Sequence, residues 1–188
     1  ARRSAPASEV VARHGCRRRG AYEFSFLGCD AVERARRLVS GLEMAIVRPE
    51  QEGDEAAIGA VYVAAFDSAD ELELYQRLRE SDVFVPELSL VVQQEEMIVA
   101  HALLSAVVAG ESEALMLGPM AILPDHQRGG LGTAMVRMGL DRARSLNYEC
   151  VVAIGPGDFL ASCGFRPARG RGLTTEMNVP DENFCVAE

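Results

Sequence analysis

The pattern of apolar and polar residues predicts two helices near the start of the regularly patterned part of the chain. The first follows a short apolar strand candidate over residues 45–47, and the acidic pair Asp54 and Glu55 favours its start, because negative charge stabilises a helix N-terminus. Its apolar positions recur at intervals of three and four, as one helix face requires: they are Ile58, Val61, Tyr62 and Ala65. A second helix is predicted to end near Glu80, after a break at residues 67–69.

Three apolar runs in the middle of the chain are separated by short acidic turns, which is typical of antiparallel strands. These runs cover residues 89–94, 97–108 and 114–123. After them, the pattern predicts a helix over 129–146, a buried strand over 150–154, a short helix over 157–163, and extended segments near 165 and over 173–179. The chain is therefore expected to form an α/β (α+β) domain whose middle part is mostly strands.

The first 43 residues differ from the rest in charge and in pattern. They hold nine arginines against five acidic residues, whereas residues 44–188 hold ten against twenty-three. Their apolar residues show no sustained period of 2 or 3.6. Three interpretations stay open: an arginine-rich transit segment, a flexible arm that binds a partner, or residues upstream of the natural start. We expect 44–188 to be the functional domain, opening at Met44, and 1–43 to be a leader that is disordered or outside that domain.

Composition narrows the class of protein. With 188 residues, of which 48% are hydrophobic and 25% charged, the chain is long enough for one domain with its own core. No apolar run reaches the roughly 18 residues of a membrane helix. The net charge of −9 disfavours nucleic-acid binding, since phosphates attract clustered basic residues. Five widely spaced cysteines and three histidines signal neither a disulfide framework nor a metal site, which favours a soluble, cytoplasmic protein.

The candidate chemistry lies where the third middle strand meets the long helix. Glycines at 129, 130 and 132 let the backbone turn tightly and approach a ligand without obstruction by a Cβ, and the helix that follows presents unpaired N–H groups at its positive end. Such a turn suits a pyrophosphate. A glycine-rich turn that only starts a helix is the alternative. Two other phosphate motifs are excluded, because no Lys-Ser/Thr follows the glycines and Met135 stands where a dinucleotide fingerprint has its third glycine.

The segment over residues 122–132, ILPDHQRGGLG, resembles the acyl-CoA signature of the GNAT superfamily of N-acetyltransferases, in which Arg/Gln-x-x-Gly-x-Gly/Ala follows a strand. Gln127, Gly130 and Gly132 fill that pattern. Three further segments look like landmarks of the superfamily: Arg48-Pro49 before a helix, the string PELSLV at 86–91, and Cys163-Gly164-Phe165. The resemblance covers about residues 44–185. Within the superfamily, the chain is most similar to a bacterial subgroup of acetyltransferases.

This resemblance implies a fold and a cosubstrate. The fold would be a mixed, mostly antiparallel sheet of about six or seven strands, splayed in the middle and flanked by about four helices. Acetyl-CoA would be bound without a metal, its pantetheine arm pairing with backbone near Ala121 and Ile122. Its pyrophosphate would rest on the turn and on the side chains of Gln127 and Arg128. The residues implied for the pyrophosphate are Gln127, Arg128, Gly129, Gly130, Leu131, Gly132 and Thr133.

The resemblance also implies a general acid that this chain lacks. Many members of the superfamily carry a tyrosine four residues before the Gly-Phe pair, and here that position is Leu160. Another donor would then protonate the thiolate, with Tyr148, Ser162, Cys163 and water as the alternatives.

The candidates for the general base are Glu113, which precedes the central part of its strand, and His101 inside the preceding strand. Each has a plainer interpretation, Glu113 as a solvated turn residue and His101 as a hydrogen-bonded core histidine.

These features together predict an acetyl-CoA-dependent N-acetyltransferase that moves an acetyl or other short acyl group to a primary amine by direct attack in a ternary complex. The amine could belong to a small molecule or to a protein, and a homodimer is an open alternative to a monomer. A non-catalytic acyl-CoA-binding sensor or interaction domain is the alternative function, because the usual tyrosine is absent.

Overall fold

The computed structural model describes residues 10–12, 45–109 and 112–188. Four α-helices lie within these ranges: α2 (Glu55–Ala65), α3 (Asp70–Arg79), α4 (Leu131–Ser145) and α5 (Gly157–Ser162). The strands are β1 (Val10–Ala12), β2 (Ala45–Pro49), β3 (Ser89–Gln94), β4 (Met97–Ala109), β5 (Ser112–Ile122), β6 (Val151–Ile154), β7 (Arg166–Pro167), β8 (Leu173–Thr175) and β9 (Phe184–Ala187). Short 3-10 turns cover Pro86–Leu88, Pro124–His126, Arg169–Arg171 and Asp181–Asn183.

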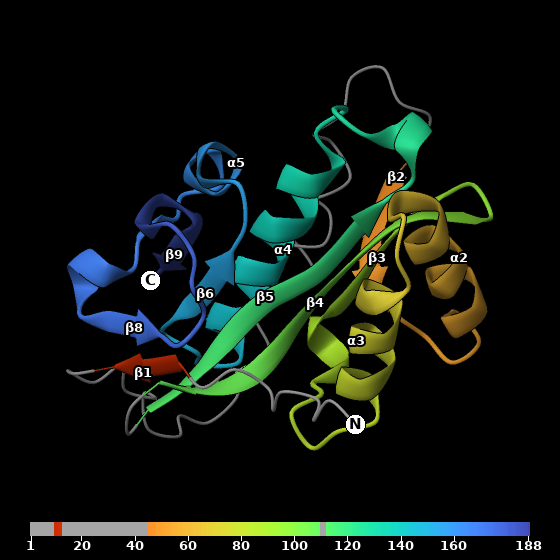
Figure 1. Cartoon of the computed structure of the whole chain (residues 1–188). Helices are drawn as coiled ribbons and strands as arrows, with labels where there is room; N and C mark the ends of the chain where they lie inside the picture. The colour runs from red at the N-terminus through yellow and green to blue at the C-terminus, as the bar shows by residue number, and fades with distance from the viewer. Residues whose placement is uncertain (1–9, 13–44, 110–111) are drawn as a thin grey trace, which may run out of the picture.

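The strands join in one mixed sheet, which Figure 1 shows as a twisted, open layer. Seven of them follow the order β2-β3-β4-β5-β6-β9-β7, and β1 and β8 join at the side. The pairs from β2 to β5 are antiparallel, β5 and β6 are parallel, and β9 is antiparallel to both of its neighbours. The predicted mixed, mostly antiparallel sheet with four helices is confirmed.

Helices cover both faces of the half of the sheet formed by β2 to β5. Successive side chains of a strand point to opposite faces, so neighbouring residues contact different helices. On one face, α2 and α3 pack on Val91 and Leu103. On the other, α4 packs on their sequence neighbours Val92 and Ala102. Figure 1 shows α2 and α3 in front of β3 and β4, with α4 behind the sheet. Among the described residues, no helix is long and apolar enough to cross a membrane.

The sheet opens between β5 and β6. The last residues that pair across these two strands are Leu117 and Ala153, yet β5 continues to Ile122 before it leads into α4. Near the same point β5 is irregular: Gly118 and Pro119 lie opposite the single residue Leu103 of β4, which is a β-bulge. Beyond Leu117, the side of β5 that faces away from β4 pairs with no strand among the described residues, and this free edge positions the site.

Two strands differ from the sequence-based expectation. The strand β9, which fills the space between β6 and β7, was not predicted, because four apolar residues at the end of the chain are too short a pattern to assign. The strand β1 comes from the leader and pairs antiparallel with β8, with one further pair, Val10 to Ala109, on β4. Met44 and the remainder of 1–43 lie outside the described residues, so the domain boundary stays a prediction.

Candidate active site

The turn between β5 and α4 has the conformation that its glycines predict. Gly130 is the N-cap of α4 and adopts φ 86°, a left-handed conformation that glycine tolerates best. The amide of Ala134 donates to the carbonyl of Gly130 at 3.0 Å. The amides of Leu131, Gly132 and Thr133 precede that donor, so helix geometry leaves them without an acceptor inside the helix. They form the positive end of α4, where an anion would bind.

The two glycines of the motif have different structural roles. A Cβ at Gly130 would meet nothing within 4 Å, so only the backbone conformation favours glycine there. A Cβ on Gly132 would lie 3.3 Å from Ile122 Cδ1 and 3.4 Å from the ring of Phe159. Gly132 therefore allows close packing of the helix start against β5 and α5. This differs from the expectation that its missing side chain faces a ligand.

The helix that carries these amides is held firmly on the sheet. Leu131 and Met135 are buried against the β3 and β4 side of the core. One turn further, a Cβ on Gly139 would lie only 2.9 Å from Leu104 Cδ1, so the glycine lets the helix axis approach the sheet closely. The start of α4 is thus positioned by packing and not by the turn alone.

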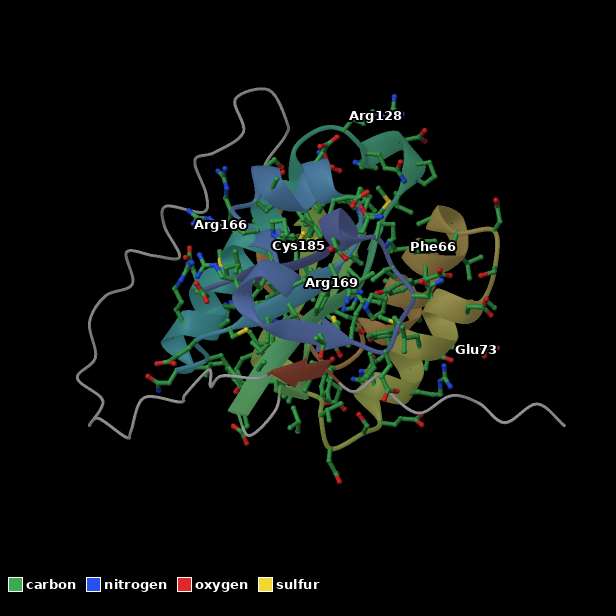
Figure 2. The ribbon with its side chains drawn as sticks, turned by 60° about the vertical axis from the view of Figure 1, so that its left-hand side comes forward. Phe66, Glu73, Arg128, Arg166, Arg169 and Cys185 are labelled. Atoms are coloured by element: carbon green, nitrogen blue, oxygen red, sulfur yellow. The ribbon has the colours of Figure 1, made fainter. Side chains whose placement is uncertain are left out.

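Gln127 and Arg128, which precede the glycines, differ in their contacts. The Gln127 amide donates to the carbonyl of Ile122 at 3.1 Å, which ties the turn to the end of β5. Arg128 adopts φ 61° and is exposed, and Figure 2 shows it projecting from the turn. The Leu123 amide bonds to Val99 of β4, so strand alternation directs the backbone groups of Ile122, and not those of Ala121, to the free edge.

The two candidate bases lie far from each other in the fold. Glu113 is exposed near the start of β5, nine residues before Ile122 and so roughly 30 Å from the glycine turn along an extended strand. His101 is fully buried on β4, opposite Ala121, beneath α2 and α3. Its ring packs edge-on against Tyr75 with centroids 4.8 Å apart. Neither candidate base therefore reaches the glycine turn: Glu113 is exposed but distant, and His101 is buried.

Both ring nitrogens of His101 are hydrogen-bonded. Its Nδ1 lies 2.9 Å from the Tyr62 hydroxyl, which is also 3.1 Å from the carbonyl of Pro119. Its Nε2 lies 2.9 Å from the Ser89 hydroxyl, and Ser89 donates in turn to Glu50. The network thus runs from Glu50, next to β2, to the β-bulge on β5.

Glu50 is the charged anchor of this network, with a carboxylate that is 4% exposed. It accepts from Arg79 Nε at 2.7 Å and from the Tyr75 hydroxyl at 3.2 Å. Burial alone would raise the pKa of Glu50, but His101, whose Nε2 lies 3.6 Å away, and the hydrogen bonds from Ser89 and Arg79 outweigh burial and lower the pKa to about 2. Burial lowers the pKa of His101, against the opposing effect of Glu50. At neutral pH we therefore assign an ionised Glu50 and a neutral His101.

Sequence reasoning missed most of this network. Glu50 and Ser89 are 39 positions apart, and Tyr62 and Pro119 are 57 apart, so no local spacing joins them. Glu50 follows a proline at a strand end, where an acidic residue is ordinarily solvated. Only the placement of β2, β3 and α2 side by side brings these groups together.

The position of the missing tyrosine is now defined. Leu160 is 3% exposed and lies in the core cluster that includes Leu117 and Ala153, the last pair before β5 and β6 diverge. Cys163 is buried in the same cluster, and Ser162 is exposed and donates to the Phe159 carbonyl at 2.6 Å. An apolar residue therefore occupies the position at which the resemblance implies a general acid.

A diverging pair of strands, a left-handed glycine and the N-terminus of a docked helix lie together at the end of β5, an arrangement that suits an anionic ligand. The sequence profile of the Acetyltransferase (GNAT) family matches residues 57–165, and the chain belongs to this family. It is thus an acyltransferase of the N-acetyltransferase type, as the sequence predicted.

The relatives agree with this assignment. An uncharacterized N-acetyltransferase of Escherichia coli, YjhQ, is 28% identical over 137 residues, which cover 70% of this chain and 76% of that protein. A GNAT family acetyltransferase of Brucella melitensis in complex with acetyl-CoA is 27% identical, with a TM-score of 0.62 over 74% of this chain and 91% of its own. The N-acetyltransferase YhbS of E. coli in complex with CoA has the same fold, with a TM-score of 0.70 at 24% identity, covering 80% and 83% of the two chains.

Proposed function

We propose that this protein transfers an acetyl or other short acyl group from CoA to a primary amine, in a ternary complex and without a covalent enzyme intermediate. The observation that carries the proposal is the turn at the end of β5. It presents free helix amides beside the edge that β5 exposes after Leu117. A strand edge suits the amide groups of pantetheine, and the helix start suits the pyrophosphate.

The cosubstrate would be held mainly by the backbone. Ile122 would offer its amide to pantetheine, because Gln127 already binds the Ile122 carbonyl, and the amides of Leu131, Gly132 and Thr133 would face the pyrophosphate. Arg128 would add an exposed positive charge, suited to phosphate oxygens. Gln127 contributes indirectly, since its amide holds the turn against Ile122.

We assign no side chain as a direct base for the amine. His101 is fully buried with both ring nitrogens engaged, and Glu113 lies at the other end of β5. We therefore propose that the acceptor reacts as the neutral amine, its proton passing to water. The net charge of −9 favours cationic amines at the surface. The relatives described above are bacterial, which favours a bacterial enzyme.

A matched pair of glycine variants tests the binding site. Gly130 and Gly53 both have positive φ, 86° and 98°, and in both a Cβ would meet nothing within 4 Å. Alanine should strain either backbone by about 1 kcal/mol. Only Gly130→Ala disturbs the turn that would hold the pyrophosphate, so we expect calorimetry to show CoA binding weakened at least about tenfold. Gly53→Ala should bind as the wild type does, and equal affinities in all three proteins would refute the placement.

Catalysis is tested by mixing acetyl-CoA with a panel of amines and measuring free thiol. Thiol release that requires an amine supports transfer. Binding of acetyl-CoA without thiol release for any amine would favour the alternative, a sensor or interaction domain, for which the missing tyrosine at Leu160 is the specific observation.

A further inference from the structure

The β-bulge on β5 lacks part of the regular ladder, and a side chain supplies a bond there. Gly118 and Pro119 lie opposite Leu103 alone, and Pro119 has no amide hydrogen to donate. The Pro119 carbonyl accepts a hydrogen bond from the Tyr62 hydroxyl at 3.1 Å. Pro119 lies two residues after Leu117, where β5 parts from β6. Tyr62 therefore holds the irregular segment of β5 at the opening of the sheet.

The direction of each hydrogen bond in the network follows from the charge on Glu50. An ionised carboxylate only accepts, so the Ser89 hydroxyl donates its single hydrogen to Glu50. The Ser89 oxygen must then accept from His101, which places a hydrogen on Nε2. In a neutral imidazole the Nδ1 atom is consequently bare and accepts from Tyr62.

Tyr62 has one hydroxyl hydrogen but two acceptors. With neutral His101, that hydrogen is shared between Nδ1 at 2.9 Å and the Pro119 carbonyl at 3.1 Å. When His101 gains a proton, Nδ1 becomes a donor to the Tyr62 oxygen, and the hydroxyl hydrogen turns wholly to Pro119. Every member of the network is then satisfied.

We propose that Tyr62 is a positioning residue for acyl transfer and that protonation of His101 switches its hydroxyl hydrogen from the imidazole to the Pro119 carbonyl. The inference rests on the proposed function, because the bulge then lies beside the thioester. Four ionisable or hydroxyl groups contact His101 from the elements around it: Glu50 after β2, Tyr62 on α2, Tyr75 on α3 and Ser89 on β3. Two further charges lie one step away, because Arg79 of α3 forms ion pairs with Glu50 and with Glu55 of α2.

The pH range of the switch follows from the surroundings of His101. Burial lowers the pKa of His101 below its ordinary value of 6.5, and Glu50 opposes this only in part. Above that range His101 is neutral and Tyr62 divides its hydrogen. As the pH falls through the lowered pKa, His101 becomes protonated and the Tyr62 hydroxyl donates its hydrogen to the Pro119 carbonyl alone.

Nuclear magnetic resonance of the full chain tests the switch without any substrate. Histidine ring ¹⁵N shifts should show the Nε2–H tautomer of His101 at pH 7, and the Pro119 carbonyl ¹³C shift should titrate together with His101. In Tyr62→Phe the Pro119 titration should disappear. An Nδ1–H tautomer, a Pro119 shift that does not follow His101, or a His101 that stays neutral down to pH 4.5 would each overturn the proposal.

Kinetics test the positioning role, using acetyl-CoA and the amine that gives the fastest thiol release. We compare the two enzymes by the ratio of their kcat values, wild type divided by Tyr62→Phe. Ionisation of the amine changes both kcat values equally, so it does not affect this ratio. One neutral hydrogen bond corresponds to roughly 2- to 10-fold, so we expect a ratio near 10 below the His101 transition and near 2 above it. The KM for acetyl-CoA should change less than about twofold.

Tyr75→Phe is the matched control. Tyr75 stacks on Tyr62 with ring centroids 5.5 Å apart and donates to Glu50, but it does not bond to Pro119. The Tyr75→Phe substitution should lower the melting temperature, and the ratio of wild-type kcat to Tyr75→Phe kcat should be constant with pH. A constant ratio for Tyr62→Phe as well would show a purely structural role and refute positioning. If no amine releases thiol, the proposed function fails while the resonance experiment still decides whether the switch exists.

Discussion

Replacing Glu50 with glutamine should remove a stabilisation that depends on pH in a defined way. The carboxylate is 4% exposed and is bound by Arg79, Tyr75 and Ser89. Its pKa is about 2 in the fold and has an ordinary value of 4.5. This difference corresponds to about 3 kcal/mol of folding free energy at neutral pH.

The sign follows from the lowered pKa. The unfolded chain binds the proton more readily, so the stabilisation is complete above pH 4.5 and is lost as the pH falls toward 2. We expect Glu50→Gln to lower the free energy of unfolding by about 3 kcal/mol at pH 7, and the deficit to be about 1 kcal/mol smaller at pH 3.5. His101 adds a separate loss in wild-type stability from pH 6.5 downward, because its pKa is also lowered in the fold.

Urea unfolding at a series of pH values measures both effects. Glu52→Gln is the control, since Glu52 is two residues away and exposed, and its substitution should change stability by less than about 0.5 kcal/mol. Equal losses in the two variants, or a Glu50→Gln deficit that does not shrink in acid, would show that Glu50 is not the ionised anchor of the network.

Two further predictions concern the leader and the missing acid. A chain that begins at Met44 should fold and bind CoA with unchanged affinity, because β1 adds only three residues beside β8; a melting temperature lower by more than several degrees would contradict this. Leu160→Tyr should raise kcat at least about tenfold over Leu160→Phe, which adds the same ring without the hydroxyl, because a positioned proton donor favours thiolate departure. Both substitutions should cost about 1–3 kcal/mol of stability in the tight core, and a tyrosine variant no faster than the phenylalanine variant would place the proton source elsewhere.

Much of the fold was predictable because it depends on local pattern. The stripe from Ile58 to Ala65 and the apolar middle runs specify α2, β3, β4 and β5 nearly to the residue. The glycine turn was predictable too, since left-handed φ at Gly130 is a property of residue type. By contrast, β9 is four residues long and depends on β6 and β7 for pairing, and no periodicity could indicate those partners.

The site was predictable only where backbone does the binding. The motif indicated the amides at the start of α4, but it suggested that Gln127 reaches phosphate, whereas its amide is bound to Ile122. It also gave Gly132 a ligand-facing role, whereas Phe159, 27 residues later, sets the space there. Side-chain direction depends on tertiary neighbours, and a single sequence does not contain their positions.

The turn between β5 and α4 and the hydrogen-bond network around His101 both hold one segment of β5. Tyr62 fixes the carbonyl of Pro119, and Gln127 fixes the carbonyl of Ile122 three residues later. Between them lies the free edge that would meet the pantetheine arm. Because the segment is bonded at both ends, a shift of the bulge would move the edge relative to the α4 amides, which packing holds in place. Under the proposed function, a change in the buried network beneath α2 would alter acyl transfer without touching the cosubstrate, whereas a change at Gly130 would alter binding first.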